Sequence, residues 1–140
     1  MEPMIYLFFN GNCLEAMTFY VDLLGGTLGE VIRNADAPDP AYRMPGGDDL
    51  VMHTSVQLGQ TMLMASDASE GMFERPQGFR VSLSPASLAE FDRIYDGLAR
   101  DAQGVAMPPG ETFFAERFAM VTDRFGTPWM LIFEGNRAQG

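Results

Sequence analysis

Apolar and polar residues at the start of the chain are spaced in a way that predicts a strand, a turn and a helix. Residues 5–9 form a short apolar run with the length and composition of a strand. After the turn residues Asn10 and Gly11, apolar side chains recur at helical spacing, at Leu14, Met17, Val21 and Leu24. Gly25 and Gly26 then favour the left-handed conformation in which many helices end.

A similar pattern returns after residue 78. Residues 79–83 predict a strand, Ser84 and Pro85 predict a turn, and a helix follows with its apolar face at Leu88, Phe91, Tyr95 and Leu98. A shift of 74 residues superimposes the two segments without a gap and places Tyr6 on Arg80. The apolar positions agree while the polar ones differ, as expected for two copies that share their packing.

Both predicted helices start with the spacing of a capping box. Asn12 precedes Glu15 by three residues, and Ser87 precedes Glu90 by three residues. In such a box the first side chain accepts a hydrogen bond from a free N–H of the first helical turn. We therefore expect Asn12 and Ser87 to cap the two helices.

Three further strands complete each copy. They are expected at residues 27–33, 50–58 and 61–66, and at residues 105–107, 118–122 and 128–133. A loop rich in Pro, Gly and Asp at 34–49 and a Pro-Pro-Gly break at 108–110 separate strands. The chain therefore predicts one α+β domain over residues 1–140, built of two βαβββ units at about 3–67 and 78–135. One helix covers one face of each sheet.

Length and charge narrow the class of protein. A chain of 140 residues can bury a core without disulfides or structural metals. The net charge of −10 disfavours nucleic-acid binding, which needs a basic face. The single cysteine, Cys13, excludes an intrachain disulfide and a thiolate metal cage. We find no signal-peptide pattern and no apolar run near the roughly 20 residues of a membrane span, so we expect a cytoplasmic protein without membrane contact.

Three stretches resemble a known family. They are YLFFNGNCLEAMTFYVDLLGG at the start, HTSVQLGQTMLMASD in the middle and TFFAERFAMVTDRFGTPWMLIFE at the end. They are similar to the PhnB-like branch of the vicinal oxygen chelate superfamily, which includes glyoxalases, bleomycin resistance proteins and dioxygenases. The resemblance implies the glyoxalase/bleomycin resistance fold, with curved mixed sheets around a shared cleft, and a homodimer. Names in this branch mention a demethylubiquinone methyltransferase, but the sequence has no Gly-rich loop after a strand to hold a nucleotide-like cofactor.

Metal-using members of the superfamily take one ligand from the first and fourth strand of each unit. The resemblance places these four positions at Tyr6, Leu63, Arg80 and Met130. None of these side chains is the His, Glu or Gln that an open divalent site uses, and the four strands contain no His, Asp, Glu or Cys. We therefore predict no metal at the family position and no other cofactor.

Strand alternation assigns the cleft-facing side chains. Phe79, Val81 and Leu83 are expected to face the helix, which turns Arg80 and Ser82 toward the cleft. The repeat predicts that Tyr6 and Phe8 also face the cleft, and Met130 is expected to face it from the last strand. An arginine fork suits a carboxylate or phosphonate, and the Tyr6 hydroxyl is a second donor.

Other candidates have two readings each. His53, the only histidine, is either a structural residue or a general base and ligand contact. Phe114 is either a lid over the cleft or a hydrophobic anchor. Trp129 is expected in the core, and Cys13 is expected as a small buried apolar residue rather than a reactive thiol.

Three functions remain open. The first is a metal-independent binding protein for a small, partly apolar and anionic molecule, with ligand contacts at Tyr6, Phe8, His53, Arg80, Ser82, Phe114 and Met130. The second is an enzyme, namely a lyase, isomerase or dioxygenase with a metal in an unusual place such as His53 with Asp67 or Glu134. The third is a dimeric interaction module without a ligand. Fold analogy alone does not choose among them.

Overall fold

The computed structural model describes residues 1–137. It divides into two compact units, Met1–Glu74 and Arg75–Gly140, and each is described by itself. Over residues 1–137 each unit contains one α-helix and one mixed sheet that does not close into a barrel. This is the α+β architecture expected from the sequence. No helix in this range is long and apolar enough to cross a bilayer.

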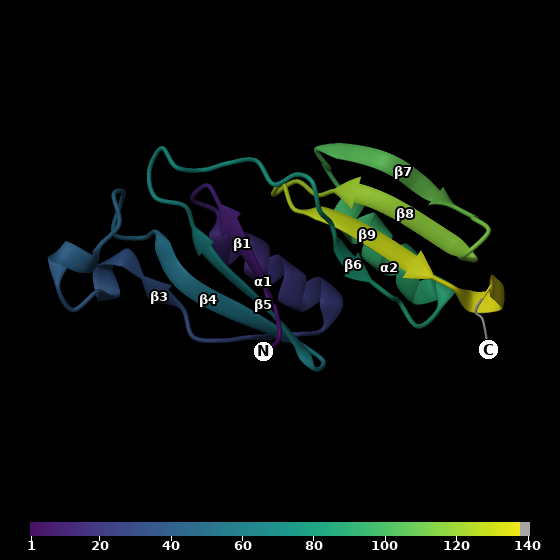
Figure 1. Ribbon diagram of the computed structural model, residues 1–140, viewed down its shortest axis with the longest axis horizontal. Helices are drawn as coiled ribbons and strands as arrows, with labels where there is room; N and C mark the ends of the chain where they lie inside the picture. Colours follow the sequence, from purple (N-terminus) through teal and green to yellow (C-terminus); the bar gives the residue numbers. More distant parts are fainter. Residues whose placement is uncertain (138–140) are drawn as a thin grey trace. The chain divides into compact units, whose positions relative to one another are not determined.

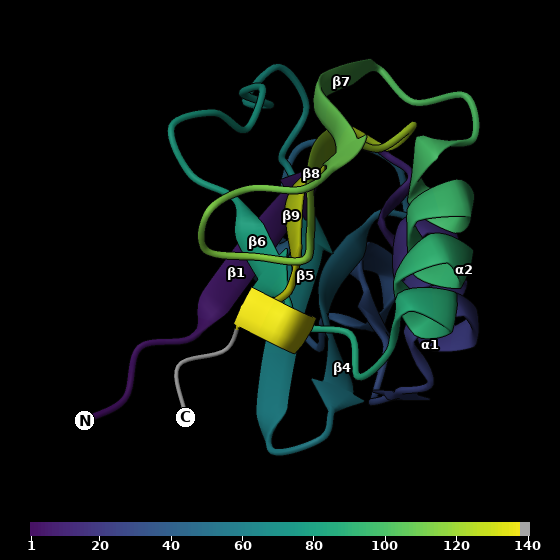
Figure 2. The same ribbon diagram turned by 90° about the vertical axis from the view of Figure 1, so that its right-hand side faces the viewer.

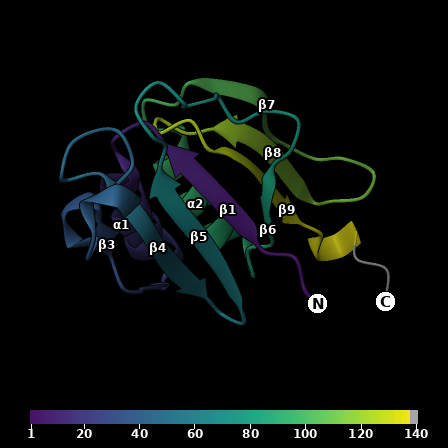
Figure 3. The same ribbon diagram turned by 60° about the vertical axis from the view of Figure 1, so that its left-hand side comes forward.

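The first unit follows the order strand, helix, strands. Its elements are β1 (Ile5–Phe9), α1 (Cys13–Leu24), β2 (Thr27–Leu28), β3 (Ile32–Arg33), the 3-10 turns η1 (Asn34–Asp36) and η2 (Pro40–Tyr42), β4 (Val51–Leu58) and β5 (Thr61–Asp67). The sheet order is β1-β5-β4-β2, and β3 also pairs with β4. β1 runs parallel to β5, whereas the other pairs are antiparallel, and Figure 3 shows β4, β5 and β1 side by side.

The second unit repeats this plan. Its elements are β6 (Val81–Leu83), α2 (Leu88–Ala99), β7 (Gly104–Gly110), β8 (Arg117–Thr122), β9 (Pro128–Phe133) and the 3-10 turn η3 (Gly135–Arg137). The sheet order is β6-β9-β8-β7, with β6 parallel to β9 (Figure 1). Figure 2 shows α2 on one side of this sheet, which leaves the opposite face of β8 and β9 without a helix. We call the side of each sheet that lies opposite its helix the open face of that unit.

Alternation along the strands separates the core from the open faces. In β1, Leu7 and Phe9 are buried while Phe8 is 53% exposed. In β9, Trp129 and Leu131 are completely buried on the side of α2, as expected for Trp129. The helices contribute the buried sets Cys13, Ala16, Met17 and Tyr20 from α1 and Phe91, Ile94 and Leu98 from α2. Of the face predicted for the first helix, only Met17 is fully buried, because the helix is rotated toward Cys13 and Tyr20.

One predicted helix cap is correct and the other is wrong. Ser87 accepts a hydrogen bond from the Glu90 N–H at 3.1 Å, as the sequence predicts. Within the described residues the Asn12 side chain makes no cap bond to α1. Asp67 replaces it from the end of β5, because its Oδ1 accepts the N–H groups of Gly11 and Cys13, each at 3.0 Å.

Three strand boundaries differ from the expectation. The segment predicted as one strand at 27–33 splits into β2 and β3, with the Gly29 N–H donating to Ser55 O between them. The strand predicted from Phe79 begins only at Val81. The Pro-Pro-Gly stretch is not a break but the end of β7, which lies at the sheet edge, where a proline without an N–H costs no ladder bond.

Candidate functional site

A cavity of about 580 Å³ lies on the open face of the second unit. Six of its lining residues come from the segment that leads into β6, and four come from β8 and β9. They are Arg75, Pro76, Gln77, Gly78, Phe79, Arg80, Met120, Thr122, Pro128 and Met130.

The register of the strands explains why these side chains meet. Val81 pairs with Trp129, and both are buried on the side of α2. Their neighbours Arg80 and Met130 therefore lie on the opposite face, as the sequence predicts. Met120 pairs with Met130 across β8 and β9, so the two methionines form the cavity floor together.

Arg80 is held at this position by the backbone. Its Nη1 donates to the Trp129 carbonyl oxygen at 3.2 Å, and the residue is half-buried. A guanidinium carries five N–H donors, so this bond leaves donors available for a ligand. Arg80 is thus oriented by the protein without being neutralised by it.

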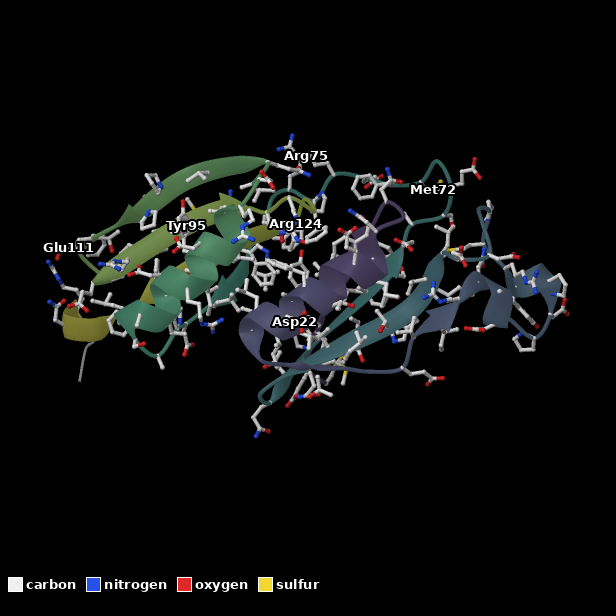
Figure 4. The ribbon with its side chains drawn as sticks, turned by 180° about the vertical axis from the view of Figure 1, so that it is seen from behind. Asp22, Met72, Arg75, Tyr95, Glu111 and Arg124 are labelled. Atoms are coloured by element: carbon white, nitrogen blue, oxygen red, sulfur yellow. The ribbon has the colours of Figure 1, made fainter. Side chains whose placement is uncertain are left out.

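Arg75, an exposed residue in the segment between β5 and β6, is a second arginine that lines the same cavity (labelled in Figure 4). Within residues 1–137 neither Arg75 nor Arg80 forms an ion pair. By contrast, Arg43, Arg117 and Arg137 form ion pairs. Since acidic residues outnumber arginines 19 to 9, two arginines without an acidic residue among the described residues that line one cavity are unexpected.

The chemistry of the lining is that of an anion site with an apolar floor. Among the described lining residues none is acidic. Two arginines can hold a carboxylate or phosphonate through charge-assisted hydrogen bonds. Methionine sulfur and methylene groups adapt to an irregular apolar ligand.

Phe79 corrects an expectation. The sequence placed its side chain toward the helix with Val81, but Phe79 is 46% exposed and lines the cavity. Strand alternation does not apply to it because β6 begins two residues later.

The open face of the first unit carries a different group. The Tyr6 hydroxyl and His53 Nδ1 are 3.1 Å apart and form a hydrogen bond. The Tyr6 ring also contacts Phe8, with ring centroids 5.0 Å apart. Tyr6, Phe8 and His53 therefore form a small aromatic cluster. This agrees with the prediction that Tyr6 and Phe8 lie on one side of β1.

Leu63 is not on this face. It pairs with Ile5 and is buried with Leu7 on the side of α1, and Met64 is the residue beside Tyr6. The prediction counted four residues from a turn glycine in both units, but the β4–β5 turn has two residues and the β8–β9 turn has five. The glycines therefore occupy different positions in the two hairpins.

The residues at the superfamily's metal positions do not fit a divalent metal. Tyr6 with Met64 in the first unit, and Arg80 with Met130 in the second, lack the nitrogen and carboxylate donors of such a site. Across residues 1–137 no three His, Cys, Asp or Glu side chains are grouped so that they could hold a metal. Asp67, named as a partner of His53, already accepts three backbone N–H groups, from Gly11, Cys13 and Val51.

Two other predicted ligand contacts do not line the cavity. Ser82 lies on the open face beside Met130 and is exposed. Phe114 is 42% exposed and stacks edge-on against Phe118, with ring centroids 5.2 Å apart. Neither is among the described residues that form the cavity wall.

Cys13 is buried and unreactive in its setting. Burial, assisted by the nearby Asp67 charge, raises the pKa of the Cys13 thiol from 9.0 to about 12. Position near a helix start does not lower the pKa of this thiol, because burial and then the Asp67 charge both raise it.

Sequence reasoning missed Arg75. It lies outside the predicted strands, in a segment rich in Pro, Gln and Gly, where no periodicity assigns a direction. The available signal was its spacing of five residues from Arg80 in a chain with only 9 basic residues against 19 acidic ones.

Most of the chain is similar to known proteins. The profile of the family described as 3-demethylubiquinone-9 3-methyltransferase matches residues 2–132. Protein YjdN of Escherichia coli (strain K12) is 35% identical over 136 residues, which cover 90% of each chain.

Solved structures agree with the fold. Protein PA1353 from Pseudomonas aeruginosa is 41% identical, with a TM-score of 0.85 and coverage of 96% of this chain and 98% of its own. A Bacillus cereus structure described as a putative 3-demethylubiquinone-9 3-methyltransferase, PhnB protein, is 24% identical, with a TM-score of 0.80 and coverage of 95% and 99%. The fosfomycin resistance protein FosX from Listeria monocytogenes is 8% identical with a TM-score of 0.66 and coverage of 99% and 98%, which shows a shared fold alone.

Proposed function

Since the chain belongs to the family described as 3-demethylubiquinone-9 3-methyltransferase, on the glyoxalase/bleomycin resistance fold, we propose that it binds a small anionic molecule in the cavity of its second unit. The anion is a carboxylate or phosphonate attached to an apolar group. Binding needs no metal in this proposal.

One observation carries the proposal. Arg75 and Arg80 line one cavity, and within residues 1–137 neither is paired with a carboxylate. Arg80 is half-buried whereas Arg75 is exposed, and burying part of the Arg80 guanidinium beside a cavity is costly unless a partner compensates it. In a chain of net charge −10, such a pair also provides a local attraction for anions that the rest of the surface does not.

Methyl transfer, the activity in the family description, is not part of the proposal. Nucleotide-like cofactors are commonly held by free N–H groups at a Gly-rich turn between a strand and a helix. In this chain the β1–α1 turn offers Gly11 and Cys13 N–H groups, and Asp67 already accepts both. Those two N–H groups are therefore not free to hold such a cofactor.

The expected homodimer remains a proposal. It is supported by β1, which is an edge strand of its sheet and exposes Ile5 (37%) and Phe8 (53%). Unpaired apolar edge strands are common sites of association. Light scattering coupled to size exclusion at micromolar concentration should give twice the chain mass, and a monomer mass would reject this part.

A thermal-shift screen tests the binding proposal. Small carboxylates and phosphonates with apolar groups should raise the melting temperature, because a ligand stabilises the state it binds. The increase should disappear in Arg80→Ala and persist in Arg100→Ala, which removes an exposed arginine outside the cavity. No increase with any anion, or an equal increase in both variants, would reject the proposal.

Elemental analysis of the purified protein tests its metal independence. We expect less than about a tenth of an equivalent of zinc, iron, nickel or manganese per chain, since the donor sets do not fit a divalent metal. About one equivalent of a divalent metal, lost in His53→Ala, would favour the enzyme alternative instead.

A further inference from the structure

An apolar strip on the open face of the second unit begins at the cavity floor and extends past it. We define this strip as Met120 and Phe118 on β8 with their partners Met130 and Ile132 on β9. Residues 117, 119 and 121 alternate to the side of α2, where Arg117 pairs with Asp92 of the helix. The strip therefore lies on the same face as Arg80.

Phe114 closes the far end of the strip. It is exposed and contacts Phe118, which is only 6% exposed, so that at this end of the strip a ligand would touch the Phe114 ring rather than Phe118. Thr112 fixes the loop, because its Oγ1 accepts the N–H groups of Phe114 (3.3 Å) and Ala115 (3.0 Å). The loop is also tied to the sheet by the Glu116 N–H, which donates to Glu134 O at 3.0 Å. The Phe114 ring is thus positioned before any ligand arrives.

The two ends of this face differ in charge. The arginines lie at the end where Thr122 pairs with Pro128. The loop with Phe114 leads into β8 at the other end, where Phe118 pairs with Ile132. Figure 4 shows Arg75 and Glu111, which precedes the loop, at opposite ends of the unit. Glu111 forms an ion pair with Arg137. The Arg137 guanidinium is therefore not free to bind a second anion at the far end.

We propose that the ligand is a straight, amphipathic carboxylate whose head binds Arg75 and Arg80 and whose apolar tail lies along the strip toward Phe114. This inference rests on the proposed function and adds the class and length of the ligand. Four residues separate the two ends along β8, a span of roughly 13 Å, which matches an alkyl chain of about ten carbons. The length of the strip therefore sets the longest tail that still gains affinity, which we call the length limit.

Calorimetric titration of the full chain with straight-chain carboxylates of increasing length tests the length limit. Complete burial of one methylene corresponds to about fourfold in affinity. A tail on an open face loses only part of its contact with water, so we expect about threefold tighter binding per added pair of carbons. The gain should stop at about ten carbons, where the strip ends.

Matched variants place the tail. Phe114→Ala should leave butanoate binding unchanged and weaken decanoate binding about fivefold, because only the long chain reaches the ring. Phe113→Ala removes the same side chain from the same loop at a position that is 88% exposed, and it should change decanoate binding less than about twofold. Equal losses in the two variants would overturn the placement.

The outcomes separate this inference from the proposed function. If butanoate and decanoate bind equally well and both depend on Arg80, the length limit is wrong and the proposed anion site stands. If no carboxylate binds, both fail. If decanoate binding survives in Arg80→Ala and grows without limit with chain length, the tail is adsorbed nonspecifically and the inference is overturned. If a ligand-free dimer dissociates in Met120→Glu, a second copy of the chain covers the strip and the inference is overturned.

Discussion

The two units share their packing and differ on their open faces. Each uses a buried carboxylate to fix a turn: Asp67 accepts three backbone N–H groups, and Asp123 accepts those of Phe125 and Thr127 together with the Trp129 indole N–H. On the open faces, equivalent positions carry Tyr6 bonded to His53 in one unit and Arg80 beside Arg75 in the other. A repeated scaffold can therefore keep its internal interactions while its two open faces acquire different chemistry.

The largest expected effect concerns the shared packing. Asp67→Ala should lower the free energy of unfolding by about 3 to 5 kcal/mol, because three backbone N–H groups lose their acceptor in the interior. Asp123→Ala should cost about as much, through the Phe125, Thr127 and Trp129 donors. Urea denaturation measures both.

Asp22→Ala is the control, since Asp22 is exposed on α1 (Figure 4). It should change the free energy of unfolding by less than about 0.5 kcal/mol. If Asp67→Ala or Asp123→Ala resembled this control, the two carboxylates would not be the shared structural feature of the units.

The next effect concerns the difference between the faces. Arg80→Ala should weaken the binding of a carboxylate at least about tenfold, since a charge-assisted hydrogen bond contributes about 1.5 to 3 kcal/mol. His53→Ala should leave that affinity within about twofold, because the cavity contains no residue of the first unit. Calorimetric titration of both variants compares the faces directly, and a larger loss in His53→Ala would reverse the assignment.

A smaller effect appears with pH through Cys13. Its pKa is about 12 in the folded protein and 9.0 in the reference state, so the unfolded chain loses the thiol proton first as pH rises. The stabilisation is complete below pH 9 and is lost between pH 9 and 12. Between pH 9 and pH 10 the wild type should lose roughly 1 kcal/mol more than Cys13→Ala, measured by urea denaturation at both values. The same loss in both proteins would show that Cys13 titrates freely.

The smallest effect concerns the first open face. Tyr6→Phe removes the hydroxyl that bonds to His53, and because the pair is only half-buried we expect a loss of about 0.5 to 1.5 kcal/mol in unfolding free energy. Tyr42→Phe, at a residue that is 73% exposed, should change it by less than about 0.5 kcal/mol. Carboxylate affinity should stay the same in both variants, and a loss in Tyr6→Phe would show that the two faces act together.

Local pattern predicted the features that depend on neighbours in sequence. The strand β1, the helix α2 with its Ser87 cap and the burial of Trp129 all follow from periodicity over a few residues. The face of Arg80 and Met130 also follows from alternation, once the repeat fixes their strands.

Features that depend on distant residues could not be predicted in the same way. The cap of α1 comes from Asp67, which is 54 residues from the Cys13 N–H that it accepts. The face of Leu63 depends on the length of a hairpin turn, and the direction of Arg75 depends on an irregular segment. In each case local propensity leaves several conformations of similar energy, and tertiary contacts select one.

The central claim is that the second unit holds an anion through its two cavity arginines. The most direct test is NMR observation of the nine arginine side-chain Nε–H signals during titration with octanoate. The account predicts that the signals of Arg75 and Arg80 move and saturate together while Arg100 stays in place. Movement of all arginine signals to a similar extent, or movement of none, would contradict it.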